Sequence, residues 1–307
     1  MYDLIIIGSG PAGLSASIYA RRAGFDVLVL EKNAMSGGQV LNTYEVDNYP
    51  GLPGISGFDL GMKFRQHAED MEVPFETAQV TGIIDEKGAK TVIATDGKEE
   101  KRYETRAVLI ATGASHALLH VPGEDRLTGR GVSYCATCDG AFFRGKTAAV
   151  VGGGDVAVED AVFLARICAK VYLIHRRDSL RAAQSLQDAM FQYSNVEVIW
   201  DSVVEEICGQ EQVETLKLRD LKQKTVRTVE TDGVFIAVGL RPNSELFREI
   251  VACDEAGYII AGEDCTTQTE GIFAAGDVRT KSLRQIVTAV ADGANAISAI
   301  FTKLHNK

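Results

Sequence analysis

The sequence predicts an α/β protein with two doubly wound domains, each with an appended β-ribbon, the second inserted into the first. Residues 2–32 have the pattern of a strand, a glycine turn, a helix of small and apolar residues, and a second strand. Residues 147–177 repeat this pattern, so that Gly8 corresponds to Gly152 and Leu30 to Ile174. Two copies of one strand-helix-strand unit predict two parallel, Rossmann-like sheets.

Each copy is followed by alternating, β-branched residues, at 89–106 and at 213–232. These stretches predict antiparallel ribbons that turn at charged tips. The chain after Asn243 is too short for a third domain, but it contains a buried strand and a long amphipathic helix. We expect this tail to complete the first domain. The expected domains are residues 1–113 with 243–307, and an inserted domain of residues 114–242.

Composition favours an ordinary globular protein, with 46% hydrophobic and 24% charged residues among 307. A formal charge of -10 argues against nucleic acid or an anionic membrane as a partner. The N-terminal apolar run leads directly into glycines, and no stretch reaches the roughly 18 apolar residues of a membrane helix. We therefore expect no signal peptide, no membrane span and a cytoplasmic location. Six irregularly spaced cysteines do not form a disulfide framework.

The first glycine turn has the pattern GxGxxG and is placed to bind a pyrophosphate. It follows an apolar strand and opens a helix, where backbone N–H groups and the helix dipole favour an anion. Glu31 follows Gly10 by 21 residues, where a carboxylate can accept hydrogen bonds from ribose hydroxyls. The predicted contacts are Gly8, Gly10, Pro11, Ala12, Gly13 and Glu31.

The second glycine turn predicts a different dinucleotide. Its second strand ends in His175, Arg176 and Arg177, with Arg181 four residues on, and it has no acid. Guanidinium groups pair with a 2′-phosphate, so this turn favours NADPH, although a solvated basic face is the simpler alternative. A pyridine nucleotide and a flavin make a natural pair, because hydride passes between them. The predicted contacts are Gly152, Gly154, Asp155, Val156, Ala157, His175, Arg176, Arg177 and Arg181.

Cys135 and Cys138 form a CxxC motif with three possible roles. A zinc site needs four ligands, for which His116 and His120 are the candidates. A role in packing alone is the second possibility. Two intervening residues also allow the Cα separation of a disulfide, and this thiol-disulfide interpretation is favoured.

The segments GSGPAG, MSGGQ, EVDNYPG, ATG, CATCDG, GGGDVAVE, HRRDSLRA and GIFAAGDV occur in this order. Together they resemble the low-molecular-weight bacterial thioredoxin reductases, a class of pyridine nucleotide-disulfide oxidoreductases, over essentially the whole chain. The resemblance implies hydride transfer from NADPH to FAD, then reduction of a Cys135–Cys138 disulfide, then dithiol exchange with oxidised thioredoxin. It implies that Cys138 contacts the flavin and Cys135 attacks thioredoxin. Asp139 would protonate the leaving thiolate, or else be a turn residue.

The resemblance also implies flavin contacts elsewhere and a homodimer. Gly276 and Asp277 would bind the pyrophosphate and ribityl region of FAD. Leu283 replaces an aromatic residue common in relatives, which affects only ring packing. The contacts implied near the flavin ring are Gly38, Gln39, Asn48, Arg284 and Gln285, and further cofactor contacts are Lys32, Ala111, Thr112 and Gly113.

The dithiol and the NADPH turn lie in one domain and both must reach one flavin, so we expect this domain to turn about its two crossings. Phe142, Phe143 and Arg130 could form a docking surface, although the aromatic residues could equally be core. The alternatives are a reductase serving a glutaredoxin-like or peroxiredoxin-linked protein, and a zinc-stabilised nucleotide-binding interaction module. A ferredoxin-linked relative would lack the second glycine turn and its arginines.

Overall fold

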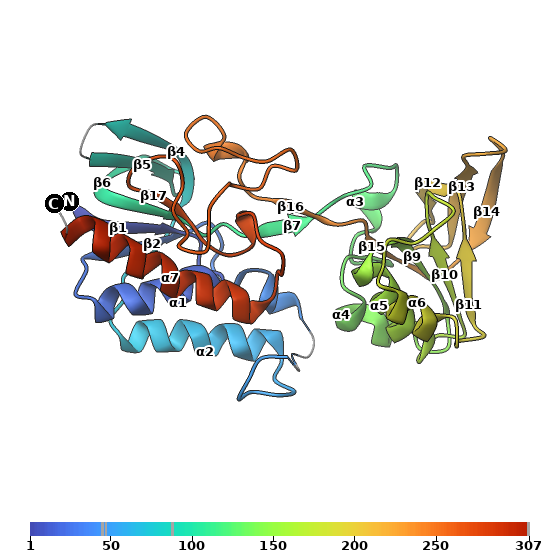
Figure 1. Ribbon diagram of the computed structural model, residues 1–307. Helices are drawn as coiled ribbons and strands as arrows, with labels where there is room; N and C mark the ends of the chain where they lie inside the picture. Colours follow the sequence, from blue (N-terminus) through green and yellow to red (C-terminus); the bar gives the residue numbers. More distant parts are fainter. Residues whose placement is uncertain (44–45, 47, 87–88, 306–307) are drawn as a thin grey trace. The chain divides into compact units, whose positions relative to one another are not determined.

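The computed structural model describes residues 1–43, 46, 48–86 and 89–305 and divides the chain into two compact units (Figure 1). Unit 1 consists of Met1–Ser115 with Arg241–Lys307, and unit 2 of His116–Leu240. The chain crosses between them in β7 (Ala114–His116) and β16 (Leu240–Pro242), which pair as a two-stranded sheet. The predicted fold class, two α/β units with the second inserted into the first, is confirmed.

Unit 1 contains a seven-stranded sheet in the order β3-β2-β1-β6-β5-β4, with β17 also paired to β6. The last half of β6 is parallel to β1 and β17, and its first half is antiparallel to β5. The strands are β1 (Tyr2–Ile7), β2 (Val27–Glu31), β3 (Phe75–Thr77), β4 (Gln79–Glu86), β5 (Ala89–Thr95), β6 (Glu100–Ile110) and β17 (Ile272–Ala274). The helices are α1 (Pro11–Arg22), α2 (Gly57–Asp70) and α7 (Ile286–His305), with 3-10 turns η1 (Gly38–Asn42), η3 (Glu245–Phe247) and η4 (Gly276–Val278).

Burial of β1 on both faces of the sheet explains why the N-terminal run is apolar at every position. Leu4 and Ile6 belong to a core that includes residues of α1 and α7, whereas Ile5 and Ile7 belong to a second core on the other face. Successive side chains of a strand point to opposite faces, so a strand covered on both faces needs every position apolar. Helices α1 and α7 pack side by side below the sheet (Figure 1).

Unit 2 repeats this architecture. Its parallel sheet has the order β11-β10-β9-β15-β8, which matches β3-β2-β1-β6-β17 strand for strand. The strands are β8 (Val132–Ser133), β9 (Thr147–Gly152), β10 (Lys170–Ile174), β11 (Val196–Ile199), β12 (Ser202–Cys208), β13 (Thr215–Asp220), β14 (Val226–Glu230) and β15 (Gly233–Ala237). The helices are α3 (Glu124–Leu127), α4 (Ala136–Asp139), α5 (Asp155–Ala165) and α6 (Gln184–Met190), with the 3-10 turn η2 (Gly140–Phe143).

The two predicted ribbons are present, as β5–β6 and β13–β14. Each has one strand more than predicted, because β4 pairs with β5 and β12 pairs with β13. Both added pairs contain a register shift, between Val80 and Gly82 and between Val204 and Glu206. Such bulges interrupt the alternation from which strands are predicted.

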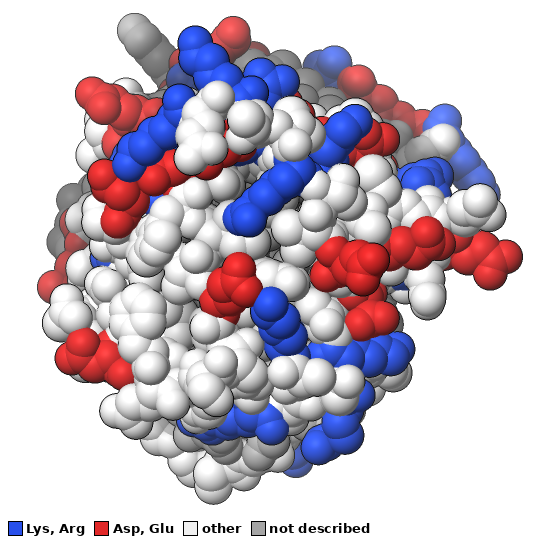
Figure 2. All heavy atoms as spheres, turned by 90° about the vertical axis from the view of Figure 1, so that its right-hand side faces the viewer, with Lys and Arg blue, Asp and Glu red and all other residues white. Residues whose placement is uncertain are grey.

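Charges of both signs are mixed on the surface. Figure 2 shows Lys and Arg side chains interspersed with Asp and Glu on the face that it presents. No helix in the described part of the chain is both long and apolar enough to span a bilayer.

Candidate active site

The first glycine turn joins β1 to α1, and its three glycines meet different surroundings. A Cβ on Gly13 would lie 2.0 Å from the carbonyl oxygen of Gly8, so this position needs glycine for close packing. Gly8 has a φ of +102° and lies against the backbone of Ala111. At Gly10, by contrast, no atom of the described residues other than its chain neighbours lies within 4 Å of an added Cβ. The middle of the turn is therefore open, as expected of a backbone that a pyrophosphate approaches. Pro11 occupies the start of α1.

Glu31 lies at the end of β2, as predicted, and Ser9 holds it beside the turn. Its Oε2 accepts hydrogen bonds from the backbone N–H of Ser9 at 2.8 Å and from the Ser9 hydroxyl at 2.9 Å. Its Oε1 accepts from the N–H of Asn33 at 2.9 Å. The neighbouring Lys32 is exposed. The carboxylate is thus fixed next to the open backbone, where a ribose would follow a pyrophosphate.

Several residues implied to contact the flavin come together in unit 1. A Cβ on Gly38 would lie 3.3 Å from the Cα of Gly10, so the GGQ segment borders the first turn, with Gln39 exposed. Asn48 donates from Nδ2 to Oε1 of Gln285 at 2.9 Å, across 237 residues of sequence. These two side chains come from separate motifs, and the fold brings them together.

The turn after β17 contains a buried polar atom without a partner. Oδ1 of Asp277 is buried and has no hydrogen-bond partner among the described residues. Burial raises the pKa of this carboxyl, with Lys281 and Arg284 opposing the shift. A bound ligand with hydroxyl groups would satisfy such an atom, and this is the strongest sign that the site fits a ribityl chain.

Asp292 of α7 fixes this turn from behind. Its Oδ2 accepts from the N–H of Gly276 at 2.8 Å, so that backbone proton is already hydrogen-bonded. The same carboxylate accepts from Arg279 at 2.8 and 2.6 Å and from Lys281 at 2.9 Å. One buried carboxylate thus neutralises one of two buried cations, and the cluster keeps a net positive charge beside Asp277.

Arg284 is held by an aromatic ring. Its guanidinium carbon lies 3.8 Å from the centroid of the Tyr258 ring, and its Nη2 donates to the carbonyl of Arg279 at 3.4 Å. Its buried Nε has no partner among the described residues. Cation–π packing fixes the plane of the guanidinium and leaves that donor for a ligand.

The ATG segment follows β6 and borders the first turn, since Ala111 donates to the carbonyl of Ile7 at 2.9 Å. Asn243 binds the rest of it. Its Nδ2 donates to the carbonyl of Thr112 at 2.9 Å, and its N–H donates to the carbonyl of Gly113 at 3.0 Å. The hydroxyl of Ser115 donates to Asn243 Oδ1 at 2.8 Å. One asparagine therefore ties together the two ends of unit 1 where the chain leaves and returns.

The second glycine turn, between β9 and α5, is built differently. A Cβ on Gly152 would lie 2.4 Å from the carbonyl oxygen of Ala237, whereas a Cβ on Gly154 would have no described residue except its chain neighbours within 4 Å. A Cβ on Gly153 would lie 2.2 Å from the ring of His175. His175 is buried beneath this turn, and its Nε2 has no partner among the described residues. Burial is the largest cause that lowers its pKa.

The arginines of the second turn are exposed, unlike His175. Arg176, Arg177 and Arg181 are all exposed, and the N–H of Arg181 donates to the carbonyl of Gly153 at 2.7 Å. Asp155 accepts at Oδ1 from the N–H of Ala183 at 2.8 Å, which fixes the loop that follows β10. The start of α5 places Val156 in solvent and Ala157 in the core.

The CxxC motif lies where β8 ends and α4 begins. Cys135 is disulfide-bonded, and its Sγ lies 3.4 Å from the hydroxyl of Thr137. The side chain of Cys138 lies outside the described part of the structure, so the predicted pairing stays a prediction. Asp139 accepts at Oδ2 from the hydroxyl of Ser133 at 2.6 Å. Its N–H donates to the carbonyl of Cys135 at 3.2 Å.

The other cysteines are free, and the buried ones are poorly reactive. Cys168, Cys208, Cys253 and Cys265 are free thiols. Burial raises the pKa of Cys168 to about 11 and that of Cys265 to about 12. A thiol reacts as its thiolate, so these two are inert at neutral pH.

The histidines considered as zinc ligands have other surroundings. His116 stacks on the ring of Tyr134 with centroids 5.8 Å apart, and burial lowers its pKa. The N–H of His120 donates to Glu124. Among the described residues, no group of three or more His, Cys, Asp or Glu side chains is placed to hold a metal ion.

The two aromatic residues after the motif differ in exposure. Phe142 is 74% exposed, whereas Phe143 is 8% exposed and packs edge-on against Phe235. Phe143 is therefore a core residue, and only Phe142 remains available for docking.

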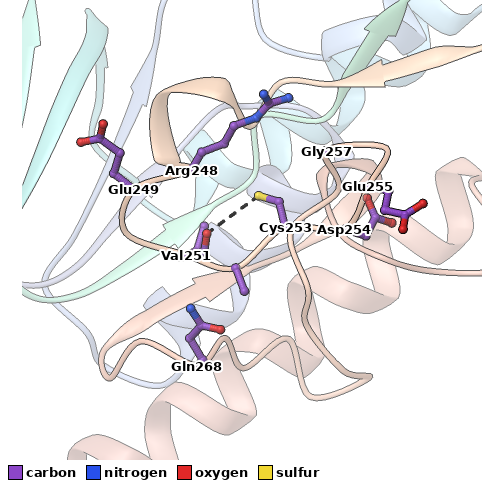
Figure 3. Close-up of a pocket in the computed structure, with 9 residues that line it drawn as sticks. Arg248, Glu249, Val251, Cys253, Asp254, Glu255, Gly257 and Gln268 are labelled. Carbon is purple, nitrogen blue, oxygen red and sulfur yellow. Dashed lines mark hydrogen bonds between the residues drawn. The ribbon is translucent and has the colours of Figure 1, made fainter.

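A separate pocket of about 390 Å³ lies in unit 1 (Figure 3). It is lined by residues 248–257 in part and by Gln268, and Sγ of Cys253 lies 3.9 Å from the carbonyl of Val251 at its wall. None of its lining residues belongs to either glycine turn or to the CxxC motif.

A family model described as pyridine nucleotide-disulphide oxidoreductase matches residues 2–293. The chain belongs to this family. Thioredoxin reductase of Listeria innocua serovar 6a is 48% identical over 294 residues, covering 95% of this chain and 91% of the relative. That of Bacillus subtilis strain 168 is 45% identical over 301 residues, covering 98% and 94%. A crystal structure of Lactococcus lactis thioredoxin reductase in the FR conformation has a TM-score of 0.87 at 42% identity and covers 100% of each chain.

For this oxidoreductase of the pyridine nucleotide-disulphide family, sequence reasoning missed Ser9, Ser133, Asn243 and Asp292. Asp292 had a visible signal, since Ala289, Gly293 and Ala296 surround it at helical spacing. A carboxylate on the buried face of a helix requires a cationic partner. The other three had none, because their partners depend on how separate segments meet.

Proposed function

We propose that this chain is an NADPH-dependent thioredoxin reductase with FAD as its second cofactor. One observation in particular supports this: a disulfide-bonded Cys135 lies in the same unit as a glycine turn bordered by three exposed arginines. Membership of the family and relatives named thioredoxin reductase at 48% and 45% identity support the same activity.

The residues of unit 1 fit FAD and those of unit 2 fit NADPH. We assign FAD to the open turn at Gly10, with Glu31 for the ribose, Asp277 for the ribityl chain, and the Asn48–Gln285 pair near the ring. NADPH is assigned to the turn at Gly154, with the exposed arginines for its 2′-phosphate. Bound FAD supplies the two-electron chemistry between nicotinamide and disulfide.

The dithiol formed in this way reduces thioredoxin by thiol-disulfide exchange. The Cys135 thiolate attacks one sulfur of the thioredoxin disulfide, and a mixed disulfide forms as that S–S bond breaks. The Cys138 thiolate then attacks Cys135, which restores the disulfide and releases reduced thioredoxin. Asp139 gives its proton to a departing thiolate and regains one from solvent. The balance is one NADPH, one proton and one disulfide converted to NADP⁺ and a dithiol.

Thioredoxin is proposed to dock at the surface next to Cys135. Phe142 is 74% exposed and lies four residues beyond Cys138, and Arg130 is exposed on the other side of the motif. Phenylalanine and arginine are both enriched in protein interfaces relative to the rest of the surface. A cytoplasmic location and a homodimer are further parts of this proposal.

The acceptor is tested by NADPH oxidation with a panel of oxidised proteins. The purified chain, loaded with FAD, is assayed with thioredoxin, a glutaredoxin-type protein and a peroxiredoxin. We expect NADPH consumption with thioredoxin, and the Cys138→Ser variant should lose it while NADPH still bleaches the flavin. Consumption only with another acceptor would replace thioredoxin as the substrate, and retained thioredoxin reduction by Cys138→Ser would refute the assignment of the motif.

A further inference from the structure

Ser133 connects the attacking cysteine with the acid. It is the last residue of β8, it is 5% exposed, and its hydroxyl donates to Oδ2 of Asp139 at 2.6 Å. The same oxygen accepts from the N–H of Cys135 at 3.1 Å. On the basis of the proposed function, we propose that Ser133 is a positioning residue that orients Asp139 as the proton donor for thioredoxin reduction.

The direction of these bonds follows from the single proton of the hydroxyl. Two acceptors are within reach of it, Oδ2 of Asp139 at 2.6 Å and the carbonyl oxygen of Cys135 at 3.3 Å. The shorter contact is the stronger, and an oxygen of a carboxyl group can accept it, so the hydroxyl proton lies toward Oδ2 of Asp139. The lone pairs of the hydroxyl oxygen are then left to accept from Cys135. A continuous path therefore runs from the Cys135 backbone through Ser133 to the carboxyl group of Asp139.

Ser133 lies in a strand of the buried sheet, whereas Asp139 lies at the end of a very short helix. Ser133 pairs with Phe235 in the parallel sheet, and the Phe235 side chain is fully buried. Asp139 ends α4, which has four residues and thus barely one turn. A helix this short has little stability of its own, so its geometry depends on contacts from outside. Ser133 supplies one such contact from the sheet.

The hydrogen bond from Ser133 fixes the orientation of the Asp139 carboxyl group. With Oδ2 bound to Ser133, the carboxyl group offers its other oxygen, Oδ1, to a departing thiolate. Fixing a reacting group in one geometry lowers the entropic barrier of the transfer. A simpler alternative is that Ser133 only stabilises the start of α4, as a hydroxyl does at many helix ends. The two roles differ in what happens when Asp139 can no longer give a proton.

Ser133→Thr and Ser133→Val form the first comparison. The two side chains have nearly the same shape, and only threonine keeps the hydroxyl. Each enzyme is reduced with NADPH and mixed with excess oxidised thioredoxin, and the rate constant at saturation is measured. We expect Ser133→Val to lower it about tenfold, a part of the ~10²–10⁴-fold that a positioned proton donor supplies. Ser133→Thr should stay within about threefold of the wild type, and KM for thioredoxin should change little in both.

A double-mutant cycle that combines Ser133→Val with Asp139→Asn is the decisive comparison. If Ser133 acts through the acid, Ser133→Val should reduce the rate less than about twofold further in the Asp139→Asn background. An equal loss in both backgrounds, or equal rates for the Thr and Val variants, would overturn the proposal. If the Val variant does not fold, Ser133→Ala takes its place in the same cycle.

Two controls distinguish a failure of the role of Ser133 from a failure of the proposed thioredoxin reductase function. Ser202 is another buried serine of unit 2, and its hydroxyl donates to the carbonyl of Trp200 at 2.8 Å. Ser202→Ala should leave the thioredoxin rate unchanged, and all variants should accept hydride from NADPH as the wild type does. A wild type that does not reduce thioredoxin overturns the proposed function. A wild type that does, with additive Ser133 and Asp139 effects, overturns only the role of Ser133.

Discussion

Replacing Asp292 with asparagine should lower the urea concentration at which unit 1 unfolds and releases its flavin, without destabilising unit 2. Asp292, Arg279 and Lys281 have side chains that are only 5%, 8% and 7% exposed. Burial opposes the charged form of Asp292, but hydrogen bonds from Arg279 and Lys281 outweigh it and lower the pKa of the carboxyl. The carboxylate is therefore ionised in the folded protein, and it also binds the N–H of Gly276 in the turn assigned to FAD.

The magnitude follows from the charges that Asp292→Asn would leave behind. The amide oxygen can still accept a hydrogen bond, but two buried cations lose their counter-charge. Removing one partner of a buried ion pair costs about 3–5 kcal/mol, and we expect about 3 kcal/mol because one acceptor remains. With a urea m-value of about 1–3 kcal/mol/M, the midpoint for unit 1 should fall by roughly 1–3 M.

The chain contains one tryptophan, Trp200, and this permits the two units to be followed separately. Trp200 lies in unit 2, so its fluorescence reports the unfolding of that unit, whereas flavin release reports unit 1. We expect Asp292→Asn to shift only the flavin transition. Asp59→Asn is the matched control, because Asp59 is exposed in the first turn of α2.

Two results would refute this reasoning. A flavin midpoint that moves no further than in Asp59→Asn would mean that the buried cations do not need Asp292. Equal shifts of the flavin and Trp200 transitions would mean that the effect is not confined to unit 1.

Three further predictions concern the two glycine turns and α5. Gly10→Ala should fold normally, because its Cβ would clash with no described residue, but it should fail to retain FAD, because the Cβ would occupy the space assigned to the pyrophosphate. Gly13→Ala should destabilise unit 1 itself, because its Cβ would lie 2.0 Å from a carbonyl oxygen. Equal thermal stability of the two variants would contradict this. Replacing Arg177 and Arg181 with alanine should raise KM for NADPH about 10–100-fold and leave KM for NADH nearly unchanged, and equal increases for both would exclude a 2′-phosphate contact. Burial raises the pKa of the Asp160 carboxyl from 3.8 to about 7. Between these two pH values the folded chain keeps a proton that the unfolded chain loses, so the free energy of unfolding falls as pH rises from 3.8 to about 7. Asp160→Asn should therefore stabilise unit 2 more at pH above about 7 than near pH 4, as measured by Trp200 fluorescence, and a pH-independent gain would contradict the raised pKa.

The repeated architecture was predictable because local rules and tertiary structure agree there. A strand buried on both faces reads as an unbroken apolar run, and the glycine turn after it has few conformational alternatives. In the second copy His175 stands at the position of Glu31, with Arg176 and Arg177 directly after it, and this difference is equally local. The sequence therefore predicts both turns and the difference between their expected ligands.

The contacts that support the site were not predictable, for a physical reason. Ser9 reaches Glu31 across 22 residues, and Asn243 reaches Thr112 across 131. Such bonds depend on which loops the sheet order brings together, and no local propensity encodes them. His175 illustrates the same limit: it adjoins the exposed arginines in sequence, yet it is buried because Gly153, from the turn after β9, packs against its ring.

In the proposed reaction, electrons pass from NADPH through this chain to thioredoxin by way of Cys135. The most direct test compares NADPH oxidation by the wild type and by Cys135→Ser, each loaded with FAD, with and without oxidised thioredoxin. NADPH should bleach the flavin in both proteins, and thioredoxin should stimulate continued NADPH consumption in the wild type alone. Thioredoxin-dependent consumption by Cys135→Ser, or none by the wild type, would contradict the proposed reaction.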